Sequence, residues 1–163
     1  MHAVPIKTRA GVVTIRPLRA GDTATVQAVF DRLGPRSRRL RFGHAVGELT
    51  PAQLERLARV DARHHVLVAH AGADAVGVAQ LARDDDPASA EIAYAVVDEW
   101  QRFGVGTELV KLLAADARAV GITRLHATMA LDNRASLTVM RRATTIVSRQ
   151  IDAGELYVVG LAA

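Results

Sequence analysis

The chain has 163 residues, half of them hydrophobic and 23% charged, and at roughly 150 residues per domain this length predicts one domain over residues 1–163. The absence of cysteine excludes disulfides, Cys-ligated zinc, iron–sulfur clusters and a Cys acyl-enzyme, and it favours a reducing compartment. A formal charge of +4 is too small to indicate nucleic acid, and an aromatic content of 4% is too low for a base-stacking surface.

The first part of the chain predicts one strand followed by two helices. Residues 12–18 are rich in Val, Thr and Ile, which favour a strand. Asp22 stands where a helix N-cap would, and Gly34 and Pro35 would end that helix. After a short basic segment, Thr-Pro-Ala-Gln at 50–53 has the capping-box pattern with proline in the first turn, so a second helix is expected as far as about residue 60.

The second part predicts a run of strands and then a long amphipathic helix. Three strands of one antiparallel meander are expected at residues 65–71, 76–82 and 90–97. Apolar residues then recur at helical spacing over residues 105–120, which indicates a helix with one buried face. The remaining elements are a strand at 125–130, a short helix from the cap Asn133 to Arg142, and strands at 144–148 and 156–161. The order β-α-α-β-β-β-α-β-α-β-β predicts an α+β domain with a mostly antiparallel central sheet.

The segment from Tyr94 to Thr107 is the most informative, because it joins the end of a strand to the start of the long helix through two glycines. A helix N-terminus presents unpaired N–H groups and a partial positive charge, and glycines let the backbone wrap closely around an anion. Gln-x-x-Gly-x-Gly at 101–106 is therefore a candidate pyrophosphate site. Leu109 replaces the third glycine of the dinucleotide fingerprint, and the Gly-Lys-Ser/Thr of a P-loop is missing. On the glycines alone, an ordinary strand–helix turn is the simpler interpretation.

Together with the residues around it, this segment resembles the GCN5-related N-acetyltransferase (GNAT) family. Gln-Arg-Phe-Gly-Val-Gly at 101–106, the long helix, a strand and then Asn-Arg-Ala-Ser at 133–136 follow the order of the family's acetyl-CoA motif. Ile-Arg-Pro-Leu at 15–18, and Leu-Arg-Phe at 40–42 ahead of a Thr-Pro helix, are similar to the bacterial protein lysine acetyltransferase branch. The resemblance covers about residues 14–142 and implies a GNAT-like fold, with a central, mostly antiparallel mixed sheet flanked by helices.

The resemblance also implies a role for each matching residue in binding acetyl-CoA, the acyl donor, without a metal. N–H groups at the helix start would bind the CoA pyrophosphate, with Gln101 and Arg102 shaping the loop; they belong to Phe103, Gly104, Val105, Gly106 and Thr107. The main chain of Val96 and Val97 at the strand end would pair with the pantetheine arm. Asn133 and Ser136, after the next strand, would line the far side of that arm. One N–H group of the strand end would face the thioester oxygen, and the last two strands would form the acceptor wall.

Transfer to an amine also needs a proton acceptor, since an amine with a pKa of about 10 is protonated at pH 7. Glu91 is the candidate catalytic base, because it is the only charge in the apolar strand 90–97. Its place five residues before Val96 also matches the base glutamate of the lysine acetyltransferase branch. A buried carboxylate would suit this task. A solvent-facing strand carboxylate is the alternative interpretation.

Two departures from the family pattern are visible. Where many members have a tyrosine that protonates the leaving CoA thiolate, this chain has Met140, so either no side-chain acid is needed or another group such as Tyr94 or Tyr157 serves. The Gly-Phe that commonly follows is replaced by Ala-Thr-Thr at 143–145, which leaves the register of the last strands open. His126 lies in a predicted strand and is interpreted as a packed core histidine rather than a catalyst.

Arginine dominates the basic residues, since Lys7 and Lys111 are the only lysines. Five arginines lie within ten residues: Arg32, Arg36, Arg38, Arg39 and Arg41. Such a cluster can receive an acidic protein surface or an anionic substrate, although most such runs are solvated faces.

The expected function is acetyl-CoA-dependent N-acetyl transfer by direct attack of an amine, with a protein lysine as the first acceptor considered. The alternatives are a small-molecule amine acetyltransferase and a non-catalytic acyl-CoA-binding regulatory module of the same fold, which Met140 keeps open. The chain has neither an apolar signal-peptide core near its start nor a run of 18 apolar residues, so the cytoplasm is the expected compartment. No nucleic-acid or membrane partner is expected, and the sequence assigns no oligomeric state.

Overall fold

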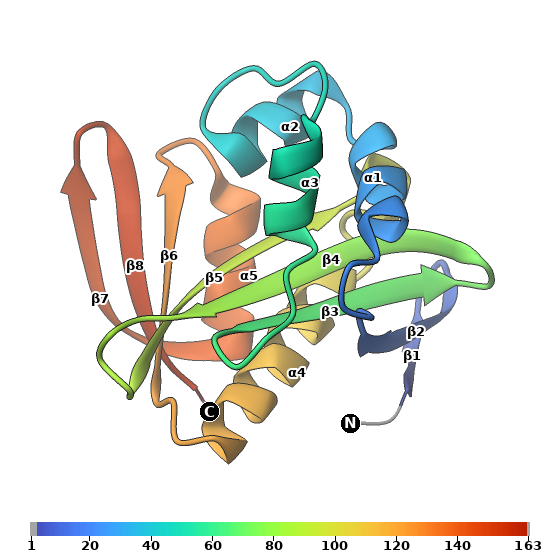
Figure 1. Cartoon of the computed structure of the whole chain (residues 1–163). Helices are drawn as coiled ribbons and strands as arrows, with labels where there is room; N and C mark the ends of the chain where they lie inside the picture. Colours follow the sequence, from blue (N-terminus) through green and yellow to red (C-terminus); the bar gives the residue numbers. More distant parts are fainter. Residues whose placement is uncertain (1–2, 163) are drawn as a thin grey trace.

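A single eight-stranded sheet organises the chain in the computed structural model, which describes residues 3–162 (Figure 1). The strands are β1 (Val4–Thr8), β2 (Gly11–Pro17), β3 (His64–Ala71), β4 (Asp74–Arg83), β5 (Ser89–Val96), β6 (Arg124–Ala130), β7 (Thr144–Asp152) and β8 (Glu155–Ala162). The helices are α1 (Thr23–Asp31), α2 (Pro35–Phe42), α3 (Pro51–Leu57), α4 (Val105–Ala119) and α5 (Arg134–Ala143), with a 3-10 turn, η1, at Asp98–Trp100. The strand order is β1-β2-β3-β4-β5-β6-β8-β7, and every neighbouring pair is antiparallel except β5 and β6. The predicted α+β class with a mostly antiparallel sheet is confirmed.

Helices cover both faces of the middle of this sheet. α4 packs across β3, β4 and β5 behind the sheet in Figure 1, with α5 beside it, whereas α1 packs on β4 from the front and α3 packs on α1. β4 is therefore covered on both sides, and its Val76, Val78, Ala79 and Leu81 are all buried. This explains why β4 is a continuous apolar run rather than an alternating one. No helix in the described part of the chain has the length and apolar character needed to span a membrane.

Two elements, β1 and α2, were not expected from the sequence pattern. β1 pairs with β2 as an antiparallel edge hairpin. α2 has the sequence PRSRRLRF, contains no apolar stripe that faces the core and has only partly buried or exposed residues. Gly34 and Pro35 are the N-cap and first residue of α2, while α1 already ends at Asp31. Proline fits at that position because the first N–H groups of a helix have no partner within it.

β5 and β6 run parallel but stay paired over only three residues. Their Cα partners run from Ser89 with Arg124 to Glu91 with His126. β5 then continues to Val96 without pairing to β6, which follows β8 along its whole length instead. Figure 1 shows the two strands diverging from this point. The sheet is therefore split beyond Glu91, and the open edge of β5 borders the split.

The last two strands pair along their length although Ala-Thr-Thr replaces the expected Gly-Phe. Thr144 is buried at the start of β7, and its hydroxyl donates to the Met140 carbonyl at 2.8 Å. Gly160 of β8 lies against it, so that a Cβ atom at position 160 would lie only 2.1 Å from Thr144 Oγ1. β7 and β8 pair over their length with one register shift. Gly160, which has no side chain, therefore leaves the space on β8 that the Thr144 side chain fills.

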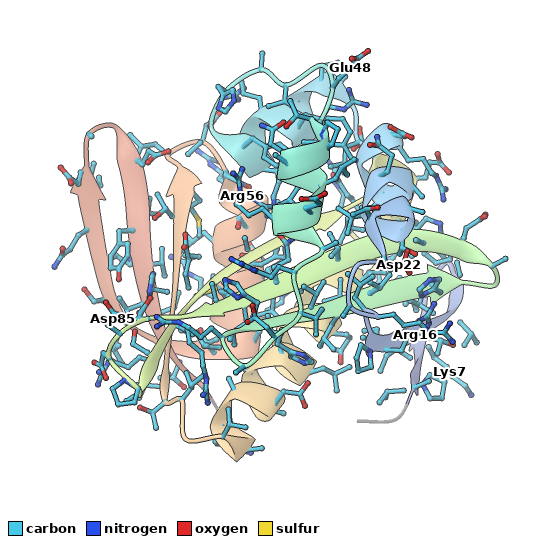
Figure 2. The ribbon with its side chains drawn as sticks, in the orientation of Figure 1. Lys7, Arg16, Asp22, Glu48, Arg56 and Asp85 are labelled. Atoms are coloured by element: carbon cyan, nitrogen blue, oxygen red, sulfur yellow. The ribbon has the colours of Figure 1, made fainter. Side chains whose placement is uncertain are left out.

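Asp22 caps α1 as expected, and Figure 2 labels it at the start of that helix. Its Oδ1 accepts the Thr25 N–H at 3.0 Å, and its Oδ2 accepts the Thr25 hydroxyl at 2.7 Å. The hydroxyl bond is the largest cause that lowers the pKa of Asp22 from its ordinary value of 3.8. We expect Asp22→Ala to lower the free energy of unfolding by about 1 kcal/mol at pH 7, measured by urea denaturation.

This loss should depend on pH. Because folding lowers the pKa of Asp22, its contribution is complete above the ordinary value of 3.8 and disappears as the pH falls through the folded-state pKa. The difference between wild type and Asp22→Ala should therefore shrink below about pH 4. Thr50→Ala is the matched control, since Thr50 accepts the Gln53 N–H at 3.2 Å in an uncharged cap. The same pH dependence in both variants would contradict the prediction.

Candidate functional site

The free edge of β5 starts where β6 diverges, and Val96, its last residue, differs from Val97, which follows it. The N–H of Val97 donates to the Val76 carbonyl on β4 at 2.9 Å, so it is used within the sheet. Successive residues of an antiparallel ladder bond to alternate sides, so the N–H of Val96, the Cα partner of Gly77, points away from β4. Val96 therefore offers its N–H to the split between β5 and β6, and Val97 does not.

Gln101 ties the loop after β5 to its surroundings. Its Nε2 donates to the Val96 carbonyl at 2.9 Å and to Ser37 Oγ on α2 at 3.1 Å. Arg102 and Gly104 both have left-handed backbone, with φ of 66° and 91°. This conformation costs glycine little, so Gly104 turns the chain into α4 as its N-cap, while Arg102 carries the strain of a side chain there. Gln101 and Arg102 thus both lie in the turn between β5 and α4, and their role in shaping it for acetyl-CoA stays a prediction.

The N-terminus of α4 presents a row of N–H groups that the helix does not use. The first bond within this helix runs from the Glu108 N–H to the Gly104 carbonyl at 3.0 Å. The preceding helical N–H groups therefore have no partner in the helix. They belong to Val105, Gly106 and Thr107. Phe103 stands just ahead of them, with 36% of its surface exposed.

The start of α5 lies opposite the β5 edge. Asn133 caps α5, and its Oδ1 accepts the Ser136 N–H at 3.0 Å. Tyr94 of β5 reaches this helix: its hydroxyl donates to the Ser136 carbonyl at 2.9 Å and lies 2.7 Å from Ser136 Oγ. Burial raises the pKa of Tyr94 to about 12, against the effect of the Ser136 hydrogen bond, so the phenol is neutral at pH 7. Met140, at the family's tyrosine position, is fully buried.

The residues expected to bind acetyl-CoA lie on elements that contact one another. They lie on the end of β5, the loop behind it and the first turns of α4 and α5. A free strand edge suits an extended arm that carries amides, and unused N–H groups at a helix start suit a pyrophosphate, so the residues present fit this ligand. Residues 3–162 contain no group of His, Cys, Asp and Glu side chains arranged to hold a metal ion.

Glu91 lies on the last paired rung before β5 and β6 part. Its side chain is exposed, whereas those of Ala90 and Ile92 on either side are buried. Because side chains alternate along a strand, Glu91 faces away from α4 and α5. It is thus solvent-facing rather than buried as expected, which leaves its carboxylate accessible to an amine on that face.

Arg41 of α2 is the cation on the Glu91 side of the sheet. It donates from its guanidinium to Gln80 Oε1 on β4. Burial lowers the pKa of Arg41 to about 10, and the negative charge of Glu91 acts in the opposite direction. At pH 7 a charged guanidinium therefore accompanies the Glu91 carboxylate.

Two further members of the arginine cluster pair with residues near the site. Arg32, the C-cap of α1, pairs with Glu99 of η1 at 3.0 Å, and Arg39 of α2 pairs with Asp132, just ahead of α5, at 3.0 Å. These pairs are largely exposed, so each adds little to stability. α2 is thus connected to the loop behind β6 through Arg39 and to the loop behind β5 through Ser37, which accepts from Gln101.

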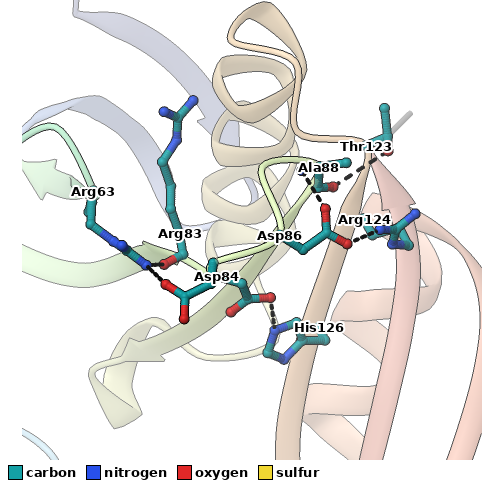
Figure 3. Close-up of polar contacts among 9 residues, drawn as sticks. Arg63, Arg83, Asp84, Asp86, Ala88, Thr123, Arg124 and His126 are labelled. Carbon is teal, nitrogen blue, oxygen red and sulfur yellow. Dashed lines mark hydrogen bonds and ion pairs between the residues drawn. The ribbon is translucent and has the colours of Figure 1, made fainter.

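A second titratable group, whose role the sequence pattern did not indicate, lies beside Glu91. His126 is the Cα partner of Glu91 on β6. Its Nε2 lies 2.8 Å from Oδ2 of Asp84 (Figure 3), and its ring packs on Tyr157 with the centroids 5.2 Å apart. His126 is thus a hydrogen-bonded group at the rim of the sheet rather than a core side chain. The sequence signal for this was the alternation of polar and apolar residues in Arg124–Ala130, which places His126 on the same face as Arg124 and Thr128.

Comparison with known sequences identifies the family. A family model described as an acetyltransferase (GNAT) domain matches residues 13–144. The chain is 31% identical over 152 residues to Acetyltransferase Pat of Mycolicibacterium smegmatis, which covers 90% of this chain and 45% of that protein. It is 29% identical over 128 residues to Acetyltransferase PA5475 of Pseudomonas aeruginosa, which covers 76% of this chain and 69% of that protein. The chain therefore spans less than half the length of Pat.

Solved structures share the fold. The GNAT domain of S. lividans PAT has a TM-score of 0.87 at 22% identity and covers 98% of this chain and 96% of its own. A cAMP-binding acyltransferase from Mycobacterium smegmatis has a TM-score of 0.67 at 26% identity and covers 99% of this chain and 48% of its own. The yncA protein from Salmonella typhimurium, solved with its cofactor acetyl-CoA, has a TM-score of 0.69 at 19% identity and covers 93% of this chain and 94% of its own. With the family model spanning most of its length, the chain belongs to the GNAT family and is an N-acetyltransferase.

Proposed function

We propose that this chain transfers the acetyl group of acetyl-CoA directly to an amine, and that the acceptor is the side chain of a protein lysine. The observation that carries this proposal is the split between β5 and β6. On its edge lie the free N–H of Val96 and the N-terminus of α4, while Glu91 stands at its apex and faces the other side of the sheet. Donor and acceptor would meet where the strands part.

Acetyl-CoA is the donor that suits the split between β5 and β6. The amides of its pantetheine arm would pair with the open edge of β5 as an added strand does, and its pyrophosphate would accept the N–H groups at 105–107. We assign the Val96 N–H to the thioester oxygen, where negative charge develops as the amine attacks. Asn133 and Ser136 would line the arm from α5.

Direct attack suits a chain that contains no cysteine, because an acyl-Cys intermediate is impossible. Glu91 would act as the base that prepares the amine. The lysine acceptor is supported by the resemblance to the lysine acetyltransferase branch. It is also supported by β7 and β8, whose helix contacts come from α4 and α5 and in front of which no helix lies in Figure 1.

Two measurements on the wild-type chain test this function. Calorimetry should show acetyl-CoA binding, and a thiol reagent should report CoA release when lysine peptides or small amines are added. We expect lysine peptides to give the higher kcat/KM. Background self-acetylation of side chains is small, since Lys7 and Lys111 are the only lysines. Turnover with small amines alone would show that the acceptor is a small amine and not a protein lysine. Tight binding of acetyl-CoA without turnover on any amine would favour a non-catalytic acyl-CoA-binding module.

A further inference from the structure

The proposed reaction removes two protons from the acceptor nitrogen. A lysine ammonium carries three hydrogens at pH 7, and the amide nitrogen of the product carries one. The C–N bond forms while the C–S bond breaks and leaves its electron pair on sulfur, so overall one proton can reach the CoA thiolate and the other goes to solvent. Both protons first leave the acceptor nitrogen. One carboxylate holds one proton at a time, so a second acceptor next to Glu91 would give the other proton a path away from that nitrogen.

His126 is placed to be that second acceptor. It is paired in register with Glu91 on the last rung before β5 and β6 part. Residues in register on neighbouring strands point to the same face, so both side chains lie on the acceptor side. Ala90 and Leu125, the preceding pair, are both fully buried on the other face, as this alternation requires.

Asp84, in the loop between β4 and β5, fixes the orientation of the His126 ring (Figure 3). A carboxylate only accepts hydrogen bonds, so Nε2 carries the hydrogen and the free lone pair of the neutral ring is on Nδ1. Nδ1 makes no hydrogen bond within residues 3–162 and is not sealed in the interior. Burial raises the pKa of Asp84, but hydrogen bonds from Ser89 and His126 outweigh it and the pKa is lowered, which keeps the carboxylate ionised at neutral pH.

The other groups around His126 belong to the same cluster. Burial raises the pKa of Tyr157, and the negative charges of Asp84 and Glu91 act in the same direction, so this phenol on β8 lies near both carboxylates. Arg41 of α2 is the cation near Glu91. Strands β5, β6 and β8, the β4–β5 loop and α2 thus each bring one polar side chain to the acceptor side of the split.

We propose that His126 is a second proton-accepting residue of the acceptor site and that Asp84 is the residue that positions it. Glu91 takes one proton from the acceptor nitrogen, and Nδ1 of His126 takes the other. Imidazole suits this task because it is the side chain that ordinarily changes charge near neutral pH. The inference rests on the proposed function, to which it adds a residue.

The test is the kcat of His126→Ala with a lysine peptide. We expect a loss of at least about tenfold, the lower end of what a positioned base contributes. Added imidazole should restore part of the rate, because it fits the space that the side chain leaves and accepts a proton. Asp84→Asn should lower kcat less, and combining it with His126→Ala should add nothing, since Asp84 acts through His126.

His65 provides a matched control. Its Nε2 lies 2.8 Å from Oδ2 of Asp116, so it has the same partner at the same distance, but it joins β3 to α4 instead of facing Glu91. His65→Ala should keep the wild-type kcat and show no response to imidazole. Thermal unfolding should show that both alanine variants are folded.

The outcomes separate the two proposals. A wild-type chain that acetylates no amine overturns the proposed function and this inference together. If Glu91→Gln loses turnover while folded His126→Ala keeps the wild-type kcat, only the inference falls. A loss in His126→Ala that imidazole leaves unchanged overturns the proton-accepting role.

Discussion

Gly106→Asp should raise the dissociation constant for acetyl-CoA by about 10³-fold. Gly106 lies in the first turn of α4, among the N–H groups assigned to the pyrophosphate. An aspartate there would place a carboxylate against that anion, and two unit charges about 4 Å apart at an effective dielectric constant of about 20 repel by about 4 kcal/mol. Calorimetric titration with acetyl-CoA measures this change directly.

Charge rather than bulk should cause this loss, and Gly106→Ala separates the two. A Cβ atom at Gly106 would lie 3.5 Å from the side chains of Val96 and Val139, which is ordinary contact. The alanine variant should therefore fold and keep most of its acetyl-CoA affinity. An acidic residue near a helix N-terminus favours the helix, so Gly106→Asp should fold as well. Wild-type affinity in the folded aspartate variant would remove the pyrophosphate assignment.

Local patterns predicted the elements whose ends are set by neighbouring residues. Asp22, Thr50 and Asn133 each cap the helix that was expected to follow. A cap needs only a side-chain oxygen and an N–H group two or three residues ahead, so the sequence contains the whole interaction. The stretch 101–107 could be predicted as a loop leading into a helix for the same reason, because all of its residues are contiguous in the sequence.

α2 could not be predicted because distant residues hold it in place. Its polar sequence has no apolar stripe, and the ties around it reach far along the chain. Ser37 accepts a hydrogen bond from Gln101, and Arg39 pairs with Asp132, at separations of 64 and 93 residues. A run of arginines has the same local pattern whether it faces solvent or is held between two loops.

The acceptor side of the site depends on strand register, which the sequence does not specify. Glu91 and His126 become neighbours only because β5 and β6 pair at that rung. Of Val96 and Val97, only Val97 has an N–H that bonds to β4, and this also depends on register, because the alignment of β5 with β4 decides which N–H groups point toward that strand. The family resemblance named both valines as binding residues, and the ladder distinguishes them.

Glu91→Gln should lower kcat by about 10²- to 10³-fold near pH 7 and leave the acetyl-CoA dissociation constant unchanged. Glutamine keeps the shape of the side chain but accepts no proton, and the exposed position of Glu91 means that folding should be unaffected. The loss should shrink as the pH rises toward about 10, because an increasing fraction of the acceptor is then already a free amine. Glu55→Gln, an exposed glutamate on α3, is the control and should keep the wild-type kcat. Equal rates in Glu91→Gln and wild type across this pH range would exclude Glu91 as the base, and His126 would then be the remaining proton acceptor on that face.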